Sequence, residues 1–90
     1  MSLRLILMRH AKSSWDDLSL PDHDRPLNRR GQRSAEAIGG WLKANDYISD
    51  RTLCSSSART RETNALLGLG TEPVILPALY HASEDRILQI

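Results

Sequence analysis

The sequence predicts a layered α/β/α fold with a largely parallel sheet. Three observations support this fold class. Short apolar segments alternate with segments of helical periodicity, in the order strand, helix, strand, helix, strand, helix. The first apolar run is nearly continuous, as in strands that are buried on both faces of a parallel sheet. A chain of 90 residues is expected to form one domain at most.

The expected strands cover residues 3–8, 51–54 and 73–76. Residues 3–8 (LRLILM) are apolar except for Arg4 and predict a buried strand. Residues 11–30 are polar and contain prolines and several aspartates, which predicts a long loop. A loop of that length in a small domain is usually functional or mobile.

A first helix is expected to begin near Asn28, which can cap it, and to end at Asn45 and Asp46. Apolar residues at helical spacing mark its inward face: Ala35, Ile38, Trp41 and Leu42.

Capping signals predict two further helices. The serines of 55–57 can cap a helix over 58–67, which stops at Gly68 and Gly70. Ser83 can cap a last helix, whose positive end suits the acids that follow, Glu84 and Asp85. The chain ends within an apolar helix face without a stop signal, so we expect a fragment or a truncated product.

Composition excludes several classes of protein. The formal net charge of +1 gives no reason to expect nucleic acid or an acidic membrane as partner, and no apolar run reaches the length of a membrane span. Cys54 is the single cysteine, so no intrachain disulfide can form, which fits a reducing cytoplasm. All 12 basic residues except Lys12 and Lys43 are arginine, the side chain that grips phosphate at two points, although codon bias also produces such a composition.

Two of the expected strands end at residues that could bind a phosphoryl group or attack it. Arg9 and His10 end the first strand, and Arg59 lies in the first helical turn after the second. Ligands of open α/β sheets bind at the carboxyl ends of strands, so these residues would converge if the strands are neighbours. Two arginines and the amides near Ser57 would then bind a phosphoryl group, and a neutral His10 could attack its phosphorus.

Four segments, in order along the chain, resemble motifs of the histidine phosphatase superfamily, also called the phosphoglycerate mutase-like family. The first contains the Arg-His signature, the second the Arg-Pro-Leu segment and its glycine, and the third a Ser-x-x-x-Arg-x-x-x-Thr pattern met by Ser55, Arg59 and Thr63. The fourth is typical of the SixA-like phosphohistidine phosphatase branch. The four segments, in chain order, read LILMRHAKSSW, DHDRPLNRRG, CSSSARTRET and LYHASEDRIL.

The resemblance implies a phosphatase that works through a phosphohistidine intermediate on His10. Arg9 and Arg59 would hold the phosphoryl oxygens, and Arg25 and Ser13 would join the substrate pocket. The substrate would be a small phosphoester or a phosphohistidine in a signalling protein. The resemblance implies no metal and no other cofactor, and residues 1–90 would be the N-terminal part of a single domain whose C-terminal part is absent.

The family completes its pocket with a second histidine in a Gly-His-Asn-like motif, which this chain lacks. His23 and His81 do not match that motif. His81 follows Tyr80 near an expected strand end, so it either approaches the crevice or faces solvent in a loop. Trp15 either packs the polar loop down or lines the substrate entrance.

Three alternatives remain at the level of sequence. A cysteine phosphatase needs five residues between Cys and Arg, but four separate Cys54 from Arg59, and Cys54 is better explained as a small buried side chain. A phosphate- or phosphoprotein-binding module without turnover would keep the same pocket. Two incomplete chains could also assemble through an open sheet edge, and the sequence leaves the oligomeric state open.

Overall fold

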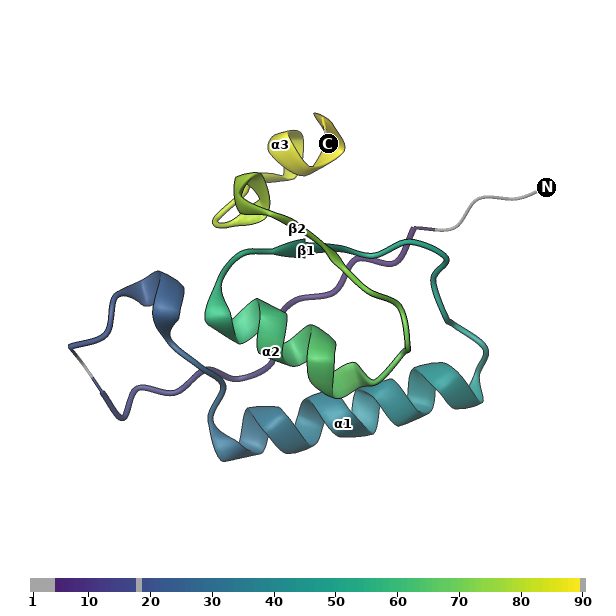
Figure 1. Ribbon diagram of the computed structural model, residues 1–90, viewed down its shortest axis with the longest axis horizontal. Helices are drawn as coiled ribbons and strands as arrows, with labels where there is room; N and C mark the ends of the chain where they lie inside the picture. The colour runs from purple at the N-terminus through teal and green to yellow at the C-terminus, as the bar shows by residue number, and fades with distance from the viewer. Residues whose placement is uncertain (1–4, 18, 90) are drawn as a thin grey trace.

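The computed structural model describes residues 5–17 and 19–89 (Figure 1). Helices and strands alternate through most of these residues, and two short 3-10 helices, η1 and η2, lie between them. The elements in chain order are η1 (Asp22–Asp24), α1 (Arg29–Ala44), β1 (Leu53–Ser55), α2 (Ala58–Leu67), β2 (Val74–Leu76), η2 (Pro77–Leu79) and α3 (Glu84–Gln89).

The sheet among the described residues has two strands, β1 and β2, which pair in parallel. The register places Cys54 opposite Ile75. A mixed helix and strand fold with a parallel sheet was predicted from the sequence and is confirmed, and α2 lies between the two strands in the chain, as a parallel connection requires.

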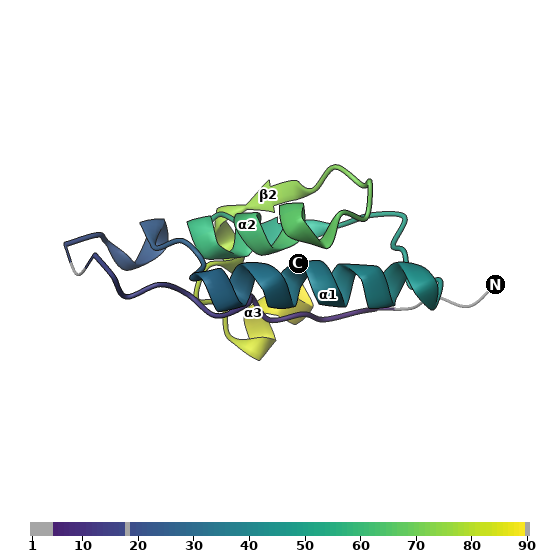
Figure 2. The ribbon, with the colours of Figure 1, turned by 90° about the horizontal axis from the view of Figure 1, so that it is seen from below.

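The predicted buried strand over residues 3–8 is wrong for the residues that are described, and residues 3 and 4 lie outside them. Residues 5–8 adopt no regular structure, and Leu5 is 80% exposed. Figure 2 shows this segment, in purple, on the side of the helices away from β2. A strand exists only through hydrogen bonds to a neighbouring strand, and the two described strands pair with each other instead.

Helix α1 begins as predicted. The side chain of Asn28 accepts a hydrogen bond from the Gly31 amide at 2.7 Å. Ala35 and Leu42 are buried, but the predicted inward face is only half correct. Ile38 is exposed, and Trp41 is 57% exposed and stacks on Tyr47.

Helices α1 and α2 lie side by side in both ribbon views (Figures 1 and 2). Gly39 permits this close approach, because a Cβ atom at that position would clash with the carbonyl oxygen of Leu67. Helix α2 ends at Gly68, whose φ of 64° is the left-handed conformation that glycine adopts readily. The core is small, and its buried apolar side chains among the described residues are Leu27, Ala35, Leu42, Cys54 and Leu67.

The two predicted serine caps differ. Ser57 occupies the cap position of α2, but its hydroxyl donates to Thr60 Oγ1 at 2.8 Å and does not bond the helix backbone. Ser83 caps α3, because its Oγ accepts from the Arg86 amide at 3.3 Å. None of the helices in the described ranges is both long and apolar enough to cross a membrane.

Candidate active site

The segment that carries His10 is fixed by α2 and by the start of α1. The Ala11 amide donates to Thr63 Oγ1 at 3.1 Å, and Thr63 in turn donates to the carbonyl of Arg59 at 2.7 Å. The Lys12 carbonyl accepts from the Asn28 amide at 3.0 Å. These contacts bring His10 to the first turn of α2, although residues 5–9 before it form no strand.

The ring of His10 has one nitrogen available as an acceptor. Its Nδ1 lies 2.6 Å from the carbonyl oxygen of Ala11, which can only accept, so Nδ1 carries the proton. Nε2 therefore holds the lone pair, and it accepts a hydrogen bond from Nε of Arg59 at 3.3 Å. A neutral histidine in this tautomer presents Nε2 as a nucleophile.

Arg59 is buried, and all three nitrogen atoms of its guanidinium donate hydrogen bonds. Besides the bond to His10, Nη1 donates to the Asp22 carbonyl at 2.6 Å and Nη2 donates to Asp22 Oδ2 at 3.0 Å. One planar fork thus contacts both the ring of His10 and the carboxylate of Asp22.

Four side chains donate to the carboxylate of Asp22. Arg25 Nη2 bonds Oδ1 at 2.9 Å, while Arg59, the Tyr80 hydroxyl (2.5 Å) and His81 Nε2 (2.8 Å) bond Oδ2. These hydrogen bonds, that of Tyr80 first, hold the pKa of Asp22 well below its usual value. The bond to the Asp22 carboxylate is also the main cause that raises the pKa of Tyr80.

Arg25 joins this cluster to the loop over residues 11–28. Its buried guanidinium donates from Nη1 to Ser13 Oγ at 2.9 Å and to the Ser14 carbonyl at 3.2 Å. The guanidinium carbon lies 3.6 Å from the ring centre of Trp15, so Trp15 packs the loop down on Arg25. The Arg25 Nε atom is buried without a hydrogen-bond partner among the described residues.

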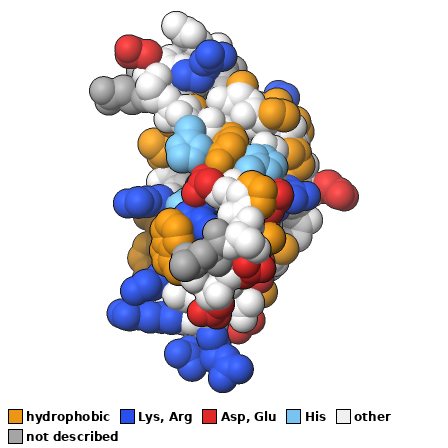
Figure 3. Space-filling view, turned by 90° about the vertical axis from the view of Figure 1, so that its left-hand side faces the viewer, with side chains coloured by type: hydrophobic (Ala, Val, Ile, Leu, Met, Phe, Trp, Pro, Cys, Tyr) orange, Lys and Arg blue, Asp and Glu red, His pale blue; other side chains and the backbone are white. Residues whose placement is uncertain are grey.

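The aromatic rings beside Asp22 form one patch. The Tyr80 ring lies 4.7 Å from the His23 ring and 4.3 Å from the His81 ring. His23 Nε2 is 2.8 Å from Ser56 Oγ. Figure 3 shows histidine, acidic and hydrophobic side chains together on this face.

The structure brings together four of the five residues that the sequence proposed for the site. His10, Arg59, Arg25 and Ser13 form one network through Asp22. The fifth, Arg9, has an exposed side chain and makes no hydrogen bond or ion pair with another residue in the described ranges.

Asp22 and Tyr80 were not proposed from the sequence, and His81 was left between crevice and solvent. His81 approaches the site, with an exposed ring whose Nε2 bonds Asp22. Tyr80 and His81 stand in a segment that matched the family, which was the one available signal. Asp22 also stands in a segment that matched the family, DHDRPLNRRG, but nothing distinguished it from the other aspartates of that polar loop.

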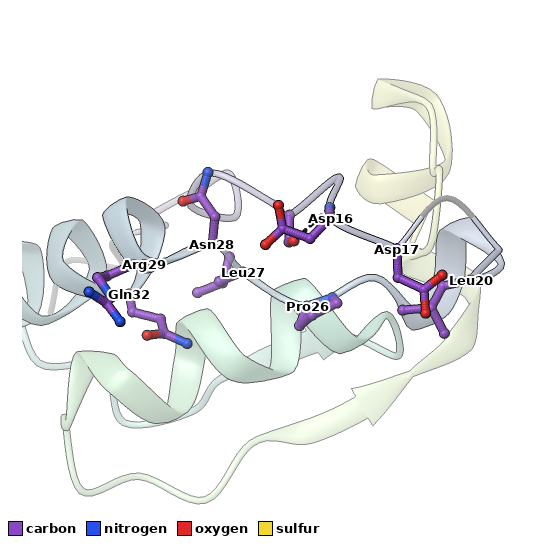
Figure 4. Close-up of a pocket in the computed structure, with 9 residues that line it drawn as sticks. Asp16, Asp17, Leu20, Pro26, Leu27, Asn28, Arg29 and Gln32 are labelled. Atoms are coloured by element: carbon purple, nitrogen blue, oxygen red, sulfur yellow. Dashed lines mark hydrogen bonds between the residues drawn. The ribbon is translucent and has the colours of Figure 1, made fainter.

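Two other features do not form the site. Cys54 is buried, and desolvation raises the pKa of its thiol, so the reactive thiolate is disfavoured. Figure 4 shows a hollow between the loop and the start of α1, lined by Asp16, Asp17 and Arg29 among others. Its lining includes neither His10 nor Arg59, so the candidate site lies elsewhere.

Comparisons with known proteins identify the family of this chain. The model of the histidine phosphatase superfamily (branch 1) matches residues 5–83. An uncharacterized protein of Mycobacterium tuberculosis (strain H37Rv) is 43% identical over 82 residues, which are 91% of this chain and 51% of the relative.

Two solved structures described as SixA have the same fold. One of them comes from Nakamurella multipartitia and is described by name as the phosphohistidine phosphatase SixA. It aligns with this chain with a TM-score of 0.84 at 40% identity. The alignment covers 92% of this chain and 46% of that one. The protein histidine phosphatase SixA complexed with tungstate aligns with a TM-score of 0.70 at 30% identity, over 80% of this chain and 47% of the other.

The chain spans about half the length of the relatives that it matches. Three observations nevertheless indicate the same family over most of this chain: the sequence motifs, the fold and the match to the family model. The chain therefore belongs to the histidine phosphatase superfamily, branch 1.

Proposed function

We propose that this chain provides the phosphoryl-accepting part of a phosphatase, with His10 as the nucleophile. The observation that carries the proposal is the pair of contacts that the His10 ring makes. Nδ1 is tied to the Ala11 carbonyl at 2.6 Å, and Nε2 points at a buried arginine. A ring held in this way directs the lone pair of Nε2 toward the cationic side chain that would bind a phosphoryl group.

The reaction would proceed in two steps. The Nε2 lone pair of His10 forms a bond to phosphorus, and the bond between phosphorus and the leaving group breaks, with its electron pair going to the leaving group. Water then attacks phosphorus, the electron pair of the N–P bond returns to Nε2 of His10, and inorganic phosphate leaves. The proton that this water gives up to solvent balances the proton that the leaving group takes from solvent. Arg59 and Arg25 would stabilise the negative charge on the transferring oxygens.

We further propose that the substrate is phosphohistidine in a protein. The support is the similarity to solved structures named SixA, together with the exposed side chain of His81 beside the candidate site. In the whole protein, residues 1–90 would form the N-terminal part of a single domain. The tungstate complex of one SixA structure supports oxyanion binding in this family.

The first test is intact-mass spectrometry after incubation with phosphoramidate, a small donor with a P–N bond. We expect one acid-labile phosphoryl group on the native chain and none on His10→Ala. His23→Ala is the matched control, because His23 bonds Ser56 and has no hydrogen bond to Arg59 or Asp22. This control should keep the adduct.

The outcomes separate the enzyme from a binding module. An adduct that decays with release of phosphate supports a phosphatase. If the native chain binds phosphate but His10 never becomes phosphorylated, the chain is a binding module and the catalytic proposal is wrong.

A further inference from the structure

The carboxylate of Asp22 lies where an anionic ligand would be expected. Four side chains from three separate segments direct donors at it: Arg25, Arg59, Tyr80 and His81. Two of the four are arginine forks, the groups best suited to phosphoryl oxygens. The carboxylate of Asp22 thus accepts hydrogen bonds from a set of donors that is suited to binding phosphate.

This carboxylate is also accessible. The side chain of Asp22 is 41% exposed, whereas those of Arg25 and Arg59 are buried. The two arginine donors are held in the interior, and the acceptor sits on the short helix η1 at the surface. An oxyanion from solvent can therefore reach the donors by taking the place of the carboxylate.

The position of Arg59 connects this site to the nucleophile. Both Nη atoms of its guanidinium donate hydrogen bonds to Asp22, and its Nε donates to His10 Nε2. While Arg59 stays in this arrangement, a hydrogen bond occupies the lone pair that would attack phosphorus.

We propose that Tyr80 and His81 form one phosphoryl-binding site with Arg25 and Arg59, and that the Asp22 carboxylate fills this site until a phosphoryl group displaces it. The choice of ligand rests on the proposed function. The placement of the donors rests on their contacts with Asp22 alone.

A different role for Asp22 makes the opposite prediction. If Asp22 only organises the donors, its removal loosens them and weakens anion binding. If Asp22 competes with the ligand, its removal strengthens anion binding. The sign of the change therefore decides between the two roles.

The test is isothermal titration calorimetry of the 90-residue chain with inorganic phosphate. Asp22→Asn is expected to tighten the phosphate Kd by about tenfold, the size of one lost charge-assisted contact to a competing acceptor. Tyr80→Phe and His81→Gln, each in the Asp22→Asn background, are expected to weaken binding severalfold. Asp22→Ala is a second variant in case the amide of Asn retains some of the contacts.

Asp24→Asn is the matched control. Asp24 lies two residues away on η1, carries the same charge and contacts His23 at 3.4 Å rather than the arginines. It should leave the phosphate Kd within about twofold of that of the native chain, which excludes a general effect of net charge. Far-UV circular dichroism of each variant checks that the fold is kept.

Unchanged or weaker phosphate binding in folded Asp22→Asn and Asp22→Ala overturns the proposal, as does a lack of phosphate binding in every folded variant. Failure here is distinct from failure of the proposed function. A His10 adduct without the Asp22 effect leaves the nucleophile assignment intact. Tighter binding in Asp22→Asn without any His10 adduct supports the anion site and rejects catalysis.

Discussion

Asp22 connects parts of the chain that are far apart in sequence. It bonds Arg25 within its own loop, Arg59 on α2, and Tyr80 and His81 after β2. Because the charged form of Asp22 receives all these hydrogen bonds, folding favours that form. Its pKa is therefore lowered from the ordinary value of 3.8.

The lowered pKa of Asp22 predicts that the protein loses stability in acid. A carboxylate with a lowered folded pKa contributes stability that is present above pH 3.8 and is lost as the pH falls through the folded value. We expect the free energy of unfolding to fall below about pH 4 and the slope to be shallower in Asp22→Asn. Urea denaturation at several pH values measures both slopes.

Asp24→Asn again provides the comparison, since it changes one carboxylate on the same short helix without touching the arginines. Equal acid slopes for native protein and Asp22→Asn would show that the contacts of Asp22 do not stabilise the fold.

The residues of the site were partly predictable from the sequence. His10, Arg59, Arg25 and Ser13 are carried by motifs at recognisable spacing, and they do lie in one network. Asp22 was not predictable, because the path of the loop depends on long-range contacts such as the bond between the Asn28 amide and the Lys12 carbonyl. Arg9 follows the motif but points to solvent.

At the scale of elements, local signals predicted the helices better than the first strand. Helix α2 runs over Ala58–Leu67, the range that its serines and Gly68 indicated, and β1 and β2 lie within two residues of their predicted ranges. Caps and glycine stops act locally, so a sequence window contains them. The strand expected over 3–8 depended on a partner that its own residues could not specify.

The contact between α1 and α2 allows a matched pair of glycine substitutions. Gly39→Ala would place a methyl group against the carbonyl of Leu67, and we expect it to destabilise the fold by about 1–3 kcal/mol. Gly40→Ala adds its methyl group to open space on the same helix and should stabilise by about 0.8 kcal/mol. Urea denaturation of both variants measures these changes.

The opposite signs matter more than the sizes, since both substitutions gain the same helix propensity. A stabilising Gly39→Ala would mean that the two helices are farther apart than the structure places them.

For the whole molecule, the distribution of apolar surface differs from the predicted one. Residues 5–8, expected in the core, are exposed, as are Leu53, Val74 and Ile75 on the two strands. A sheet of two strands buries little, and a chain that spans half the length of its relatives supplies few elements to cover it.

This distribution predicts different responses to two leucine substitutions. Leu42→Ala removes a buried side chain of α1 and should cost about 2–5 kcal/mol, enough to unfold a chain of marginal stability. Leu7→Ser changes an exposed side chain and should alter the free energy of unfolding by less than about 0.5 kcal/mol. Thermal denaturation followed by circular dichroism compares them, and a large loss from Leu7→Ser would place residues 5–8 in the core.

The stacking of Trp15 on Arg25 gives the protein a built-in optical reporter. The indole lies against the guanidinium that holds Asp22, so its emission depends on what that guanidinium binds. The other tryptophan, Trp41, stacks on Tyr47 and has no contact with this network. In a Trp41→Phe background, fluorescence would therefore follow the exchange of the internal carboxylate for an external oxyanion in real time, without a label or a chromogenic substrate.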